Sequence, residues 1–370
     1  MEAWQLLVHV CRRWRNLVLG SPRRLNLQLY CSPKTPTKDT LDIWPALPLI
    51  VGGNMAPALG TDNVIAALGQ NNRLCELFLW NLAGSQLAEV LAAMQVPFLE
   101  LTEIRFSSDG KTPPVIPDSF LGGSAPRLRY FSLYRIPFPG LPKLLCSATH
   151  LVFLNLYDIP HSGYISSQAM VALISVLSNL EELTLQFQSP QSRHDWQRRS
   201  LPPPKHSILP ALRMLNYKGV TEYLEELVTG IDTPQLNFLH ITFFNQIDFV
   251  CPRLAQFINC TPTLRTRDEA CVLFDNSTAT ITLHYRTANL DFDDLRIKVS
   301  CRESDWQVSS IEQVCNSFLH TLSTVDALHI ERGYISLELV WKSDGIDNTL
   351  WLQLLLPFTA VKNLDRKSVV

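Results

Sequence analysis

The sequence lacks the short motifs that commonly mark an enzyme. It has no glycine-rich phosphate loop, no G-x-S-x-G elbow, no H-E-x-x-H helix and no cysteine-histidine ligand spacing. One acidic run could suggest a metal site: Asp291, Phe292, Asp293, Asp294. Acidic residues at the end of a strand are usually just solvated, so we favour that interpretation. His194-Asp195 has no nucleophile nearby in the sequence. We therefore predict that the chain is not an enzyme and has no catalytic, cofactor-binding or metal-binding residues.

Charge and long apolar runs are also scarce. Charged residues make up 18% of the chain and the formal net charge is −2, which gives no bias toward nucleic acid or anionic membrane. The richest apolar runs, WPALPLIV and LWLQLLLPF, contain proline and fall well short of the about 18 residues that span a bilayer. The arginines follow the apolar run Leu6 to Val10, the reverse of a secretory signal. We predict no nucleic-acid partner, no membrane partner and a cytoplasmic and/or nuclear location.

The cysteine spacing shows no pattern of disulfide pairs or zinc ligands. There are 9, an odd number, and no two form a C-x-x-C pair. This pattern argues against both a disulfide scaffold and a zinc site. We expect reduced thiols, most of them buried.

What the sequence does contain is a recurring apolar pattern of six residues, apolar at the first, fourth and sixth. Its copies begin at Leu74, Leu101, Leu128, Leu151, Leu180, Leu212 and Leu236. The six intervals from Leu74 to Leu236 cover 162 residues, a mean of 27. This mean lies within the period of about 20–29 residues of leucine-rich repeats.

Helix-like stretches separate these copies. In one of them Met170, Leu173, Ile174 and Leu177 share a helical face behind Ser166 and Ser167 as N-caps. In another, Thr221 is the expected cap and Gly230 the stop.

A strand with one helix cannot bury both of its apolar faces alone, so such units must stack. We predict an α/β fold, an irregular leucine-rich-repeat-like solenoid of right-handed β/α repeats over residues 23–370. An ordinary α/β sandwich with coincidental spacing is the alternative.

The pattern breaks after Leu264. Two segments of period-two alternation predict an inserted strand pair near 278–301. Repeat character then returns, and the segment VKNL at Val361 begins what we expect to be an incomplete last repeat.

Residues 1–22 carry a different signal. Leu6, Val10, Trp14, Leu17 and Val18 fall on one face of a helix that Ser21-Pro22 ends. Arginines occupy the rest of the circumference. From these residues alone, a helix docked on the end of the solenoid is favoured over a nucleic-acid-binding helix.

The segment LLVHVCRRWRNLVLGSP resembles the second half of an F-box, with its valine-cysteine-basic-x-tryptophan run. Three later segments, SPRRLNLQLYC, DWQVSSIEQVCNSFLHTLSTVDALHI and LLLPFTAVKNL, resemble the leucine-rich-repeat-like F-box proteins of mushroom-forming fungi. The resemblance implies a substrate-recognition subunit of a cullin-type SCF ubiquitin ligase. The F-box would bind a Skp-type adaptor and the repeats a protein target.

Against this resemblance we expect the adaptor-binding surface to be incomplete, because the leucine-proline pair and first helix usual in an F-box do not stand before Val10. By position, the remnant 1–22 keeps Val10, Cys11, Arg12 and Trp14 as adaptor-binding residues. We expect weak adaptor binding or none. The alternative is a leucine-rich-repeat scaffold or interaction protein that no longer engages the ligase.

The target surface follows from the strand period. The third, fifth and seventh positions of each copy point away from the leucine core. Aromatic and basic side chains there are typical of protein-binding hot spots. We predict target-binding residues at Trp80, Tyr130, Tyr134, Phe153, Tyr157 and Lys218. The alternative is that loops or C-terminal strands cover this face and make it a second core.

Overall fold

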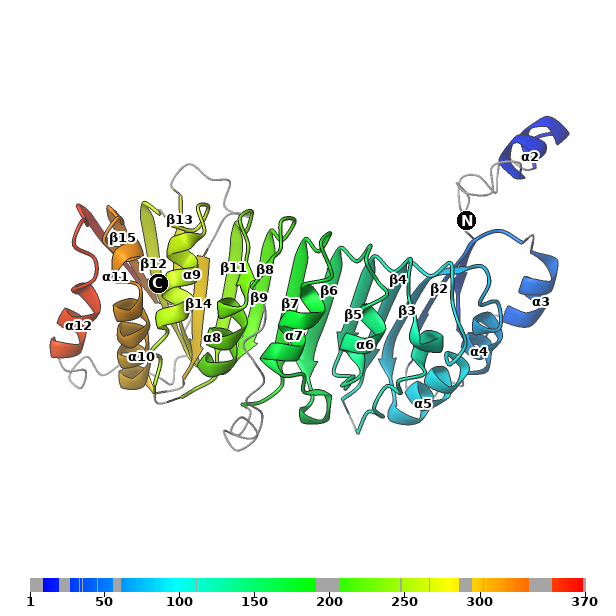
Figure 1. Cartoon of the computed structure of the whole chain (residues 1–370), viewed down its shortest axis with the longest axis horizontal. Helices are drawn as coiled ribbons and strands as arrows, with labels where there is room; N and C mark the ends of the chain where they lie inside the picture. Colours follow the sequence, from blue (N-terminus) through cyan, green and yellow to red (C-terminus); the bar gives the residue numbers. More distant parts are fainter. Residues whose placement is uncertain are drawn as a thin grey trace. The chain divides into compact units, whose positions relative to one another are not determined.

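A computed structural model gives the fold of the chain (Figure 1). It describes residues 9–19, 27–32, 34, 36–44, 46–55, 61–110, 112–190, 206–246, 248–265, 267–285, 295–301, 303–332 and 348–368. The chain divides into two compact units, Met1–Tyr164 and Ile165–Val370.

The first unit is built on parallel strands that pair in chain order. They are β1 (Leu27–Tyr30), β2 (Leu49–Asn54), β3 (Leu74–Leu82), β4 (Glu103–Ser108), β5 (Tyr130–Tyr134) and β6 (Phe153–Ile159). The helical segments are α2 (Arg12–Leu19), α3 (Thr37–Ile43), α4 (Asp62–Leu68), α5 (Gly84–Ala93), η2 (Phe120–Gly123), α6 (Leu141–Leu145) and η3 (His161–Gly163).

The strands of the second unit do not follow chain order. In space they run β7 (Glu182–Phe187), β9 (Met214–Gly219), β11 (Phe238–Phe243), β14 (Leu295–Ser300), β13 (Thr278–His284), β12 (Glu269–Asp275), β15 (Ala327–Arg332) and β16 (Asn363–Ser368). The short strands β8 (Ser207–Ile208) and β10 (Ile231–Asp232) pair separately. The helices are α7 (Ser167–Ile174), α8 (Thr221–Thr229), α9 (Pro252–Cys260), α10 (Ser304–Ser317), α11 (Leu319–Leu322) and α12 (Asn348–Leu355).

Strands occupy both segments that the sequence predicts near 278–301. β13 is antiparallel to β14 on one side and to β12 on the other, whereas the other described pairs of the sheet are parallel. Because β14 takes the place beside β11, the chain reaches it only after passing through β12 and β13. The segment expected to begin a last repeat at Val361 forms β16, and α12 precedes it.

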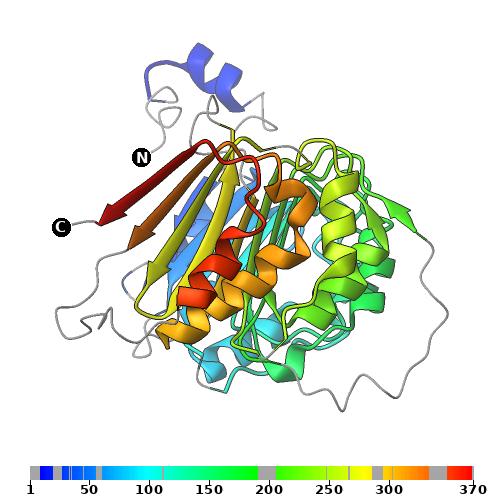
Figure 2. The same ribbon diagram turned by 90° about the vertical axis from the view of Figure 1, so that its left-hand side faces the viewer.

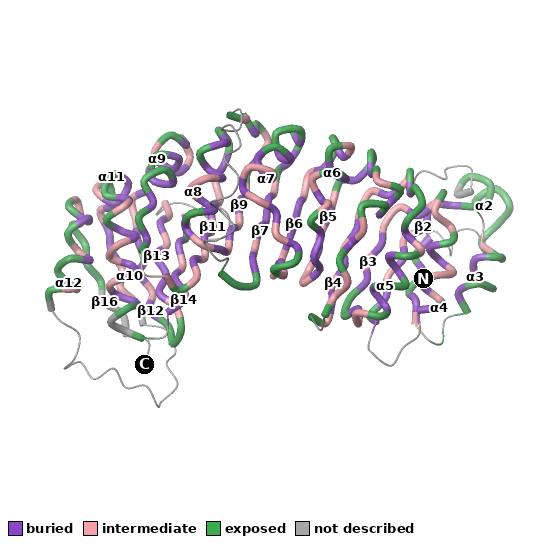
Figure 3. The backbone as a smooth tube through the Cα atoms, turned by 60° about the horizontal axis from the view of Figure 1, so that its bottom comes forward, coloured by how far each residue is buried: buried purple, intermediate pink, exposed green. Residues whose placement is uncertain are grey.

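Alternating burial explains the stacking. The leucines that open the seven copies are all buried, each no more than 2% exposed. Along the strands buried residues alternate with half-buried ones (Figure 3). In both units the helices other than α2 lie against one face of the strands (Figure 2). The fold is therefore α/β, with the irregular leucine-rich-repeat-like stacking that the leucine spacing predicts, rather than a sandwich.

The helix ends agree only in part with the predicted caps. Ser166 caps α7, since its side-chain oxygen accepts a hydrogen bond from the Ala169 backbone N–H at 3.2 Å. Gly230 ends α8, as predicted. Thr221 is not a cap: it is the first residue of α8, and its hydroxyl accepts from the Gln246 amide instead.

All nine cysteines are free, which agrees with the absence of a disulfide framework. Fewer are buried than we expected. The buried ones are Cys31, Cys251, Cys301 and Cys315, whereas Cys11, Cys146 and Cys260 are exposed. In the described part of the chain, no helix is both long and apolar enough to cross a membrane.

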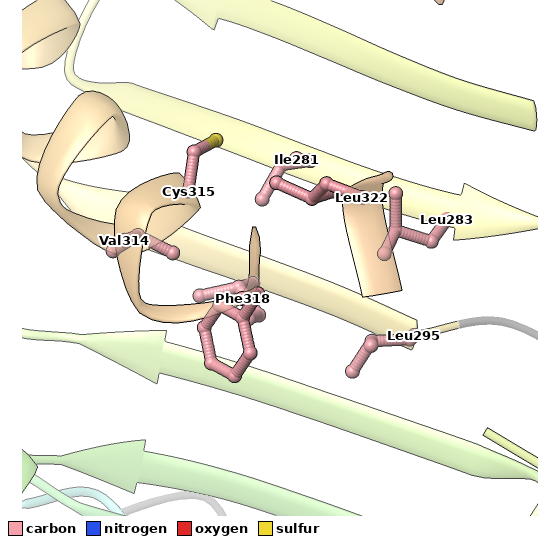
Figure 4. Close-up of a pocket in the computed structure, with 8 residues that line it drawn as sticks. Ile281, Leu283, Leu295, Val314, Cys315, Phe318 and Leu322 are labelled. Atoms are coloured by element: carbon pink, nitrogen blue, oxygen red, sulfur yellow. The ribbon is translucent and has the colours of Figure 1, made fainter. Parts of the chain in front are cut away.

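The inserted strands have their own core. Ile281, Leu283 and Leu295 face Val314, Cys315, Phe318 and Leu322 around a cavity of about 10 Å³, large enough for one water molecule at most (Figure 4). The lining is apolar, so the cavity has no polar partner to hold a water. Burial raises the pKa of the Cys315 thiol, which therefore stays protonated at neutral pH and packs as a small apolar group.

We expect Phe318→Ala to lower the free energy of unfolding by about 3–5 kcal/mol, because it enlarges this cavity. Trp306→Ala on α10 is the control, since Trp306 is 59% exposed and its loss should cost less than about 1 kcal/mol. Urea unfolding measures both. Equal effects of the two substitutions would contradict the packing of α10 on β13 and β14.

Candidate protein-binding surfaces

Helix α2 exposes an apolar face. Val10, Trp14 and Leu17 recur at helical spacing and are 64%, 47% and 58% exposed. The other residues from 9 to 17 are exposed as well. A helix of eight residues is too short to be stable by itself in water, so a face of this kind needs a partner.

The predicted adaptor-binding residues lie close together here. Val10 and Cys11 directly precede α2, Arg12 begins it and Trp14 lies in its first turn. Leu17, which the F-box resemblance did not single out, completes the apolar face with Val10 and Trp14. The helical spacing of the sequence had already placed Leu17 on this face.

The predicted target-binding residues of the first unit lie on the sheet face opposite the helices. Tyr130 pairs with Phe153, and Tyr134 with Tyr157, in the register of β5 and β6. Trp80 lies on β3 and is 42% exposed, whereas the four others are half-buried. No helix in the described part of this unit covers the face (Figure 2).

An arginine links the aromatic side chains of this face. The Arg105 guanidinium carbon lies 4.1 Å from the ring centre of Tyr130 and 5.4 Å from that of Phe78. Arg105 also forms an ion pair with Glu103. Cation–π contacts at such partly exposed sites contribute about 0.5–1 kcal/mol each, so they hold the rings in place.

Tyr130 is fixed from its other side as well. Its ring centre lies 5.2 Å from that of Phe153, and its hydroxyl accepts a hydrogen bond from the Asn155 amide at 3.2 Å.

The pKa of the neighbouring Glu76 carboxyl is raised. Burial is the main cause and the charge of Glu103 the second, while the charge of Arg105 lowers the pKa. We name Phe78, Trp80, Arg105, Tyr130, Tyr134, Phe153 and Tyr157 the aromatic face.

Phe78 and Arg105 were not among the predicted residues. Both occupy the fifth position of their copies, and the two-residue period of a strand already points that position away from the core. The signal was therefore present in the sequence. What the sequence does not reveal is that one arginine lies between two rings from different strands.

Three residues near the ends of β3, β5 and β6 have an unusual backbone conformation. Asn81, Arg135 and Asp158 follow Trp80, Tyr134 and Tyr157 directly, and their φ angles are +57°, +58° and +48°. Non-glycine residues seldom adopt this left-handed region, and it costs about 1–3 kcal/mol where neighbours do not stabilise it. Here Asn81 donates to the Asn54 side chain at 2.9 Å, and Arg135 pairs with Asp158 at 3.4 Å. The irregular backbone that follows each of the three aromatic residues is thus held by side chains.

In the second unit the predicted residue is Lys218 on β9. It is half-buried and its ammonium nitrogen lies 5.9 Å from the ring centre of Phe244. Lys218 belongs to the other unit, so the fold does not place it among the aromatic side chains of the first unit.

The second unit also holds a chain of acidic and histidine side chains. His329 Nε2 lies 2.6 Å from Glu269 and its Nδ1 lies 3.7 Å from Asp365, while His284 lies 3.6 Å from Glu269. Both ring nitrogens of His329 thus face carboxylates.

No group of three or more histidine, cysteine or acidic side chains in the described residues is arranged to hold a metal ion. The run Asp291 to Asp294 and the pair His194-Asp195 lie outside the described residues.

No protein-family model matches the chain, and no curated protein matches it significantly. The geometry of these surfaces therefore carries the functional argument.

Two adjacent residues of β3 test which side of the strand faces the core and which lies on the aromatic face. We expect Leu79→Ala to lower the free energy of unfolding by about 2–5 kcal/mol, because Leu79 is fully buried. Trp80→Ala should cost less than about 1 kcal/mol although it removes the larger side chain, because Trp80 lies on the aromatic face. Urea unfolding of both variants gives the comparison. A larger loss from Trp80→Ala would show that the aromatic face is a second core.

Proposed function

We propose that the chain is the substrate-recognition subunit of a cullin-type SCF ubiquitin ligase. In this proposal α2 binds a Skp-type adaptor, and the repeat surface binds a protein target. The observation that carries it is the exposed apolar face of α2, formed by Val10, Trp14 and Leu17 in the segment that resembles an F-box. The subunit does no chemistry of its own, and it acts in the cytoplasm or nucleus, where such a ligase works.

The aromatic face supports the second half of the proposal. Tryptophan, tyrosine and arginine are the residues most enriched in protein-binding hot spots, and they bind best when already ordered. The contacts of Arg105 with Phe78, Tyr130 and Glu103 supply that order before a target arrives. A protein target is therefore favoured over a small molecule, which would require a deep pocket.

A second candidate is a leucine-rich-repeat scaffold that does not engage the ligase. The size of the α2 face favours it, since three exposed apolar side chains on one short helix make a small contact. Both candidates share the target surface. They differ in whether α2 binds the adaptor.

We expect a purified Skp-type adaptor to bind the chain more weakly than it binds a complete F-box protein. Trp14→Ala should reduce this affinity by about tenfold or more, since it removes the largest side chain of the α2 face. Asn16→Ala, on the same helix but off the apolar face, should leave the affinity unchanged. Isothermal titration calorimetry measures the affinity of the adaptor for the unaltered chain, for both variants and for a complete F-box protein.

No measurable binding of the unaltered chain would favour the scaffold. Binding as tight as that of a complete F-box would refute the expectation that the adaptor surface is incomplete.

For the target, we expect the triple variant Trp80→Ala, Tyr134→Ala, Tyr157→Ala to lose the proteins captured by the unaltered chain. Ser107→Ala is the matched control, because Ser107 pairs directly with Tyr134 and presents no ring. Affinity purification followed by mass spectrometry identifies the captured proteins. Thermal unfolding of the triple variant should stay within a few degrees, and a collapse would show that these rings are core.

A further inference from the structure

Basic side chains gather on the open sheet face of the second unit. Thr242 on β11 pairs with Lys218 on β9 and with Lys298 on β14, so one threonine separates the two lysines. One step along the same strands, His240 pairs with Arg296. We call Lys218, His240, Arg296 and Lys298 the basic patch.

The strand geometry sets the spacing of these charges. Neighbouring strands are about 4.8 Å apart, so the Cα atoms of Lys218 and Lys298 are separated by about 10 Å. Arg296 lies two residues from Lys298 on the same face of β14. Lys218, Arg296 and Lys298 on one face give it a positive potential, which favours an anionic ligand.

The side chains of the basic patch are partly packed and partly open to solvent. Arg296 is exposed, and Lys218 and Lys298 are half-buried. Lys218 lies over the Phe244 ring, and the His240 ring centre is 3.8 Å from that of Phe238. The ammonium group of Lys218 is thus within cation–π range of Phe244, whereas Arg296 is open to solvent.

Neutral hydrogen-bonding groups surround the patch. Thr184 and Asn216 flank it on one side, with the Asn216 amide donating to the Thr184 hydroxyl at 3.3 Å. Thr280 and Thr282 flank it on β13, where they pair with Lys298 and Arg296. Thr184 and Thr280 are buried, so only the half-buried Asn216 and Thr282 can be further donors for a carboxylate.

We infer that the basic patch binds an acidic segment of the protein target. The inference deepens the proposed function, because it names the chemistry of the target, and it rests on that function. An extended polyproline II segment repeats every third residue with a rise of about 3.1 Å per residue, so acidic side chains three apart lie on one side about 9 Å from each other. This distance matches the separation of Lys218 and Lys298.

A nucleic acid fits the same surface less well. Single-stranded nucleic acid needs a basic groove that follows a long backbone. Beyond β13 the described face turns acidic, with Glu269, Asp275 and Glu331 on β12 and β15. Those carboxylates would repel a continuous phosphate chain, whereas a short acidic segment ends before reaching them.

The test uses the full chain and a fluorescein-labelled oligoglutamate peptide, followed by fluorescence anisotropy. We expect binding at low salt that is lost by about 0.5 M NaCl, where charges are screened beyond a few ångströms. The double variant Lys218→Gln, Lys298→Gln should weaken binding by about tenfold or more. Lys362→Gln makes the same charge change elsewhere in the unit and should have no effect. Thermal unfolding within a few degrees of the unaltered chain shows that the double variant is folded.

Three outcomes would overturn the inference. The first is no peptide binding at low salt, and the second is equal binding by the double variant. The third is tighter binding of a labelled single-stranded DNA that depends on the same two lysines, which would make the patch a nucleic-acid surface. The adaptor titration is independent of this test, so the proposed ligase function and the acidic target segment can fail separately.

Discussion

The structure depends on one constraint: a short strand with a single helix leaves apolar surface that only the next such unit can cover. The leucines that open each copy are buried because neighbouring strands and helices cover them from both sides. Burying a leucine side chain contributes about 1.5–3 kcal/mol, and seven equivalent positions repeat that gain along the chain. The helices of the described repeats therefore lie on the face to which the leucines point.

The same constraint creates the binding surfaces. Because the helices lie on one face, the side chains of the other face are free to vary without loss of the core. In the first unit that face gathers tryptophan, tyrosine and phenylalanine around Arg105, and in the second it gathers lysine and arginine. Two surfaces of different chemistry thus arise from one stacking rule.

Helix α2 follows a different rule. Its apolar side chains have the spacing of a packed helix, yet they are exposed. An apolar face with that spacing is typical of a helix that packs against another surface. Among the described residues of the chain, none buries this face. This is the physical reason to look for a partner at α2, and the F-box resemblance names the kind of partner.

The sequence by itself determined the repeat period, the identity of the buried leucines and the outward direction of Trp80, Tyr130, Tyr134, Phe153, Tyr157 and Lys218. These features follow from periods of two and about 27, which are local properties of the chain. It also placed Val10 and Trp14 on one helical stripe. The cap predicted at Thr221 was wrong, because a side chain from a later segment, Gln246, binds its hydroxyl.

Only the tertiary structure decided which outward residues meet. Arg105 lies between Phe78 and Tyr130 because three neighbouring strands hold them in register. Lys298 and Arg296 lie near Lys218 because β14, not β12, pairs with β11. No local period specifies that choice, since it depends on how β12, β13 and β14 bury their apolar faces against α10 once all of them are in place.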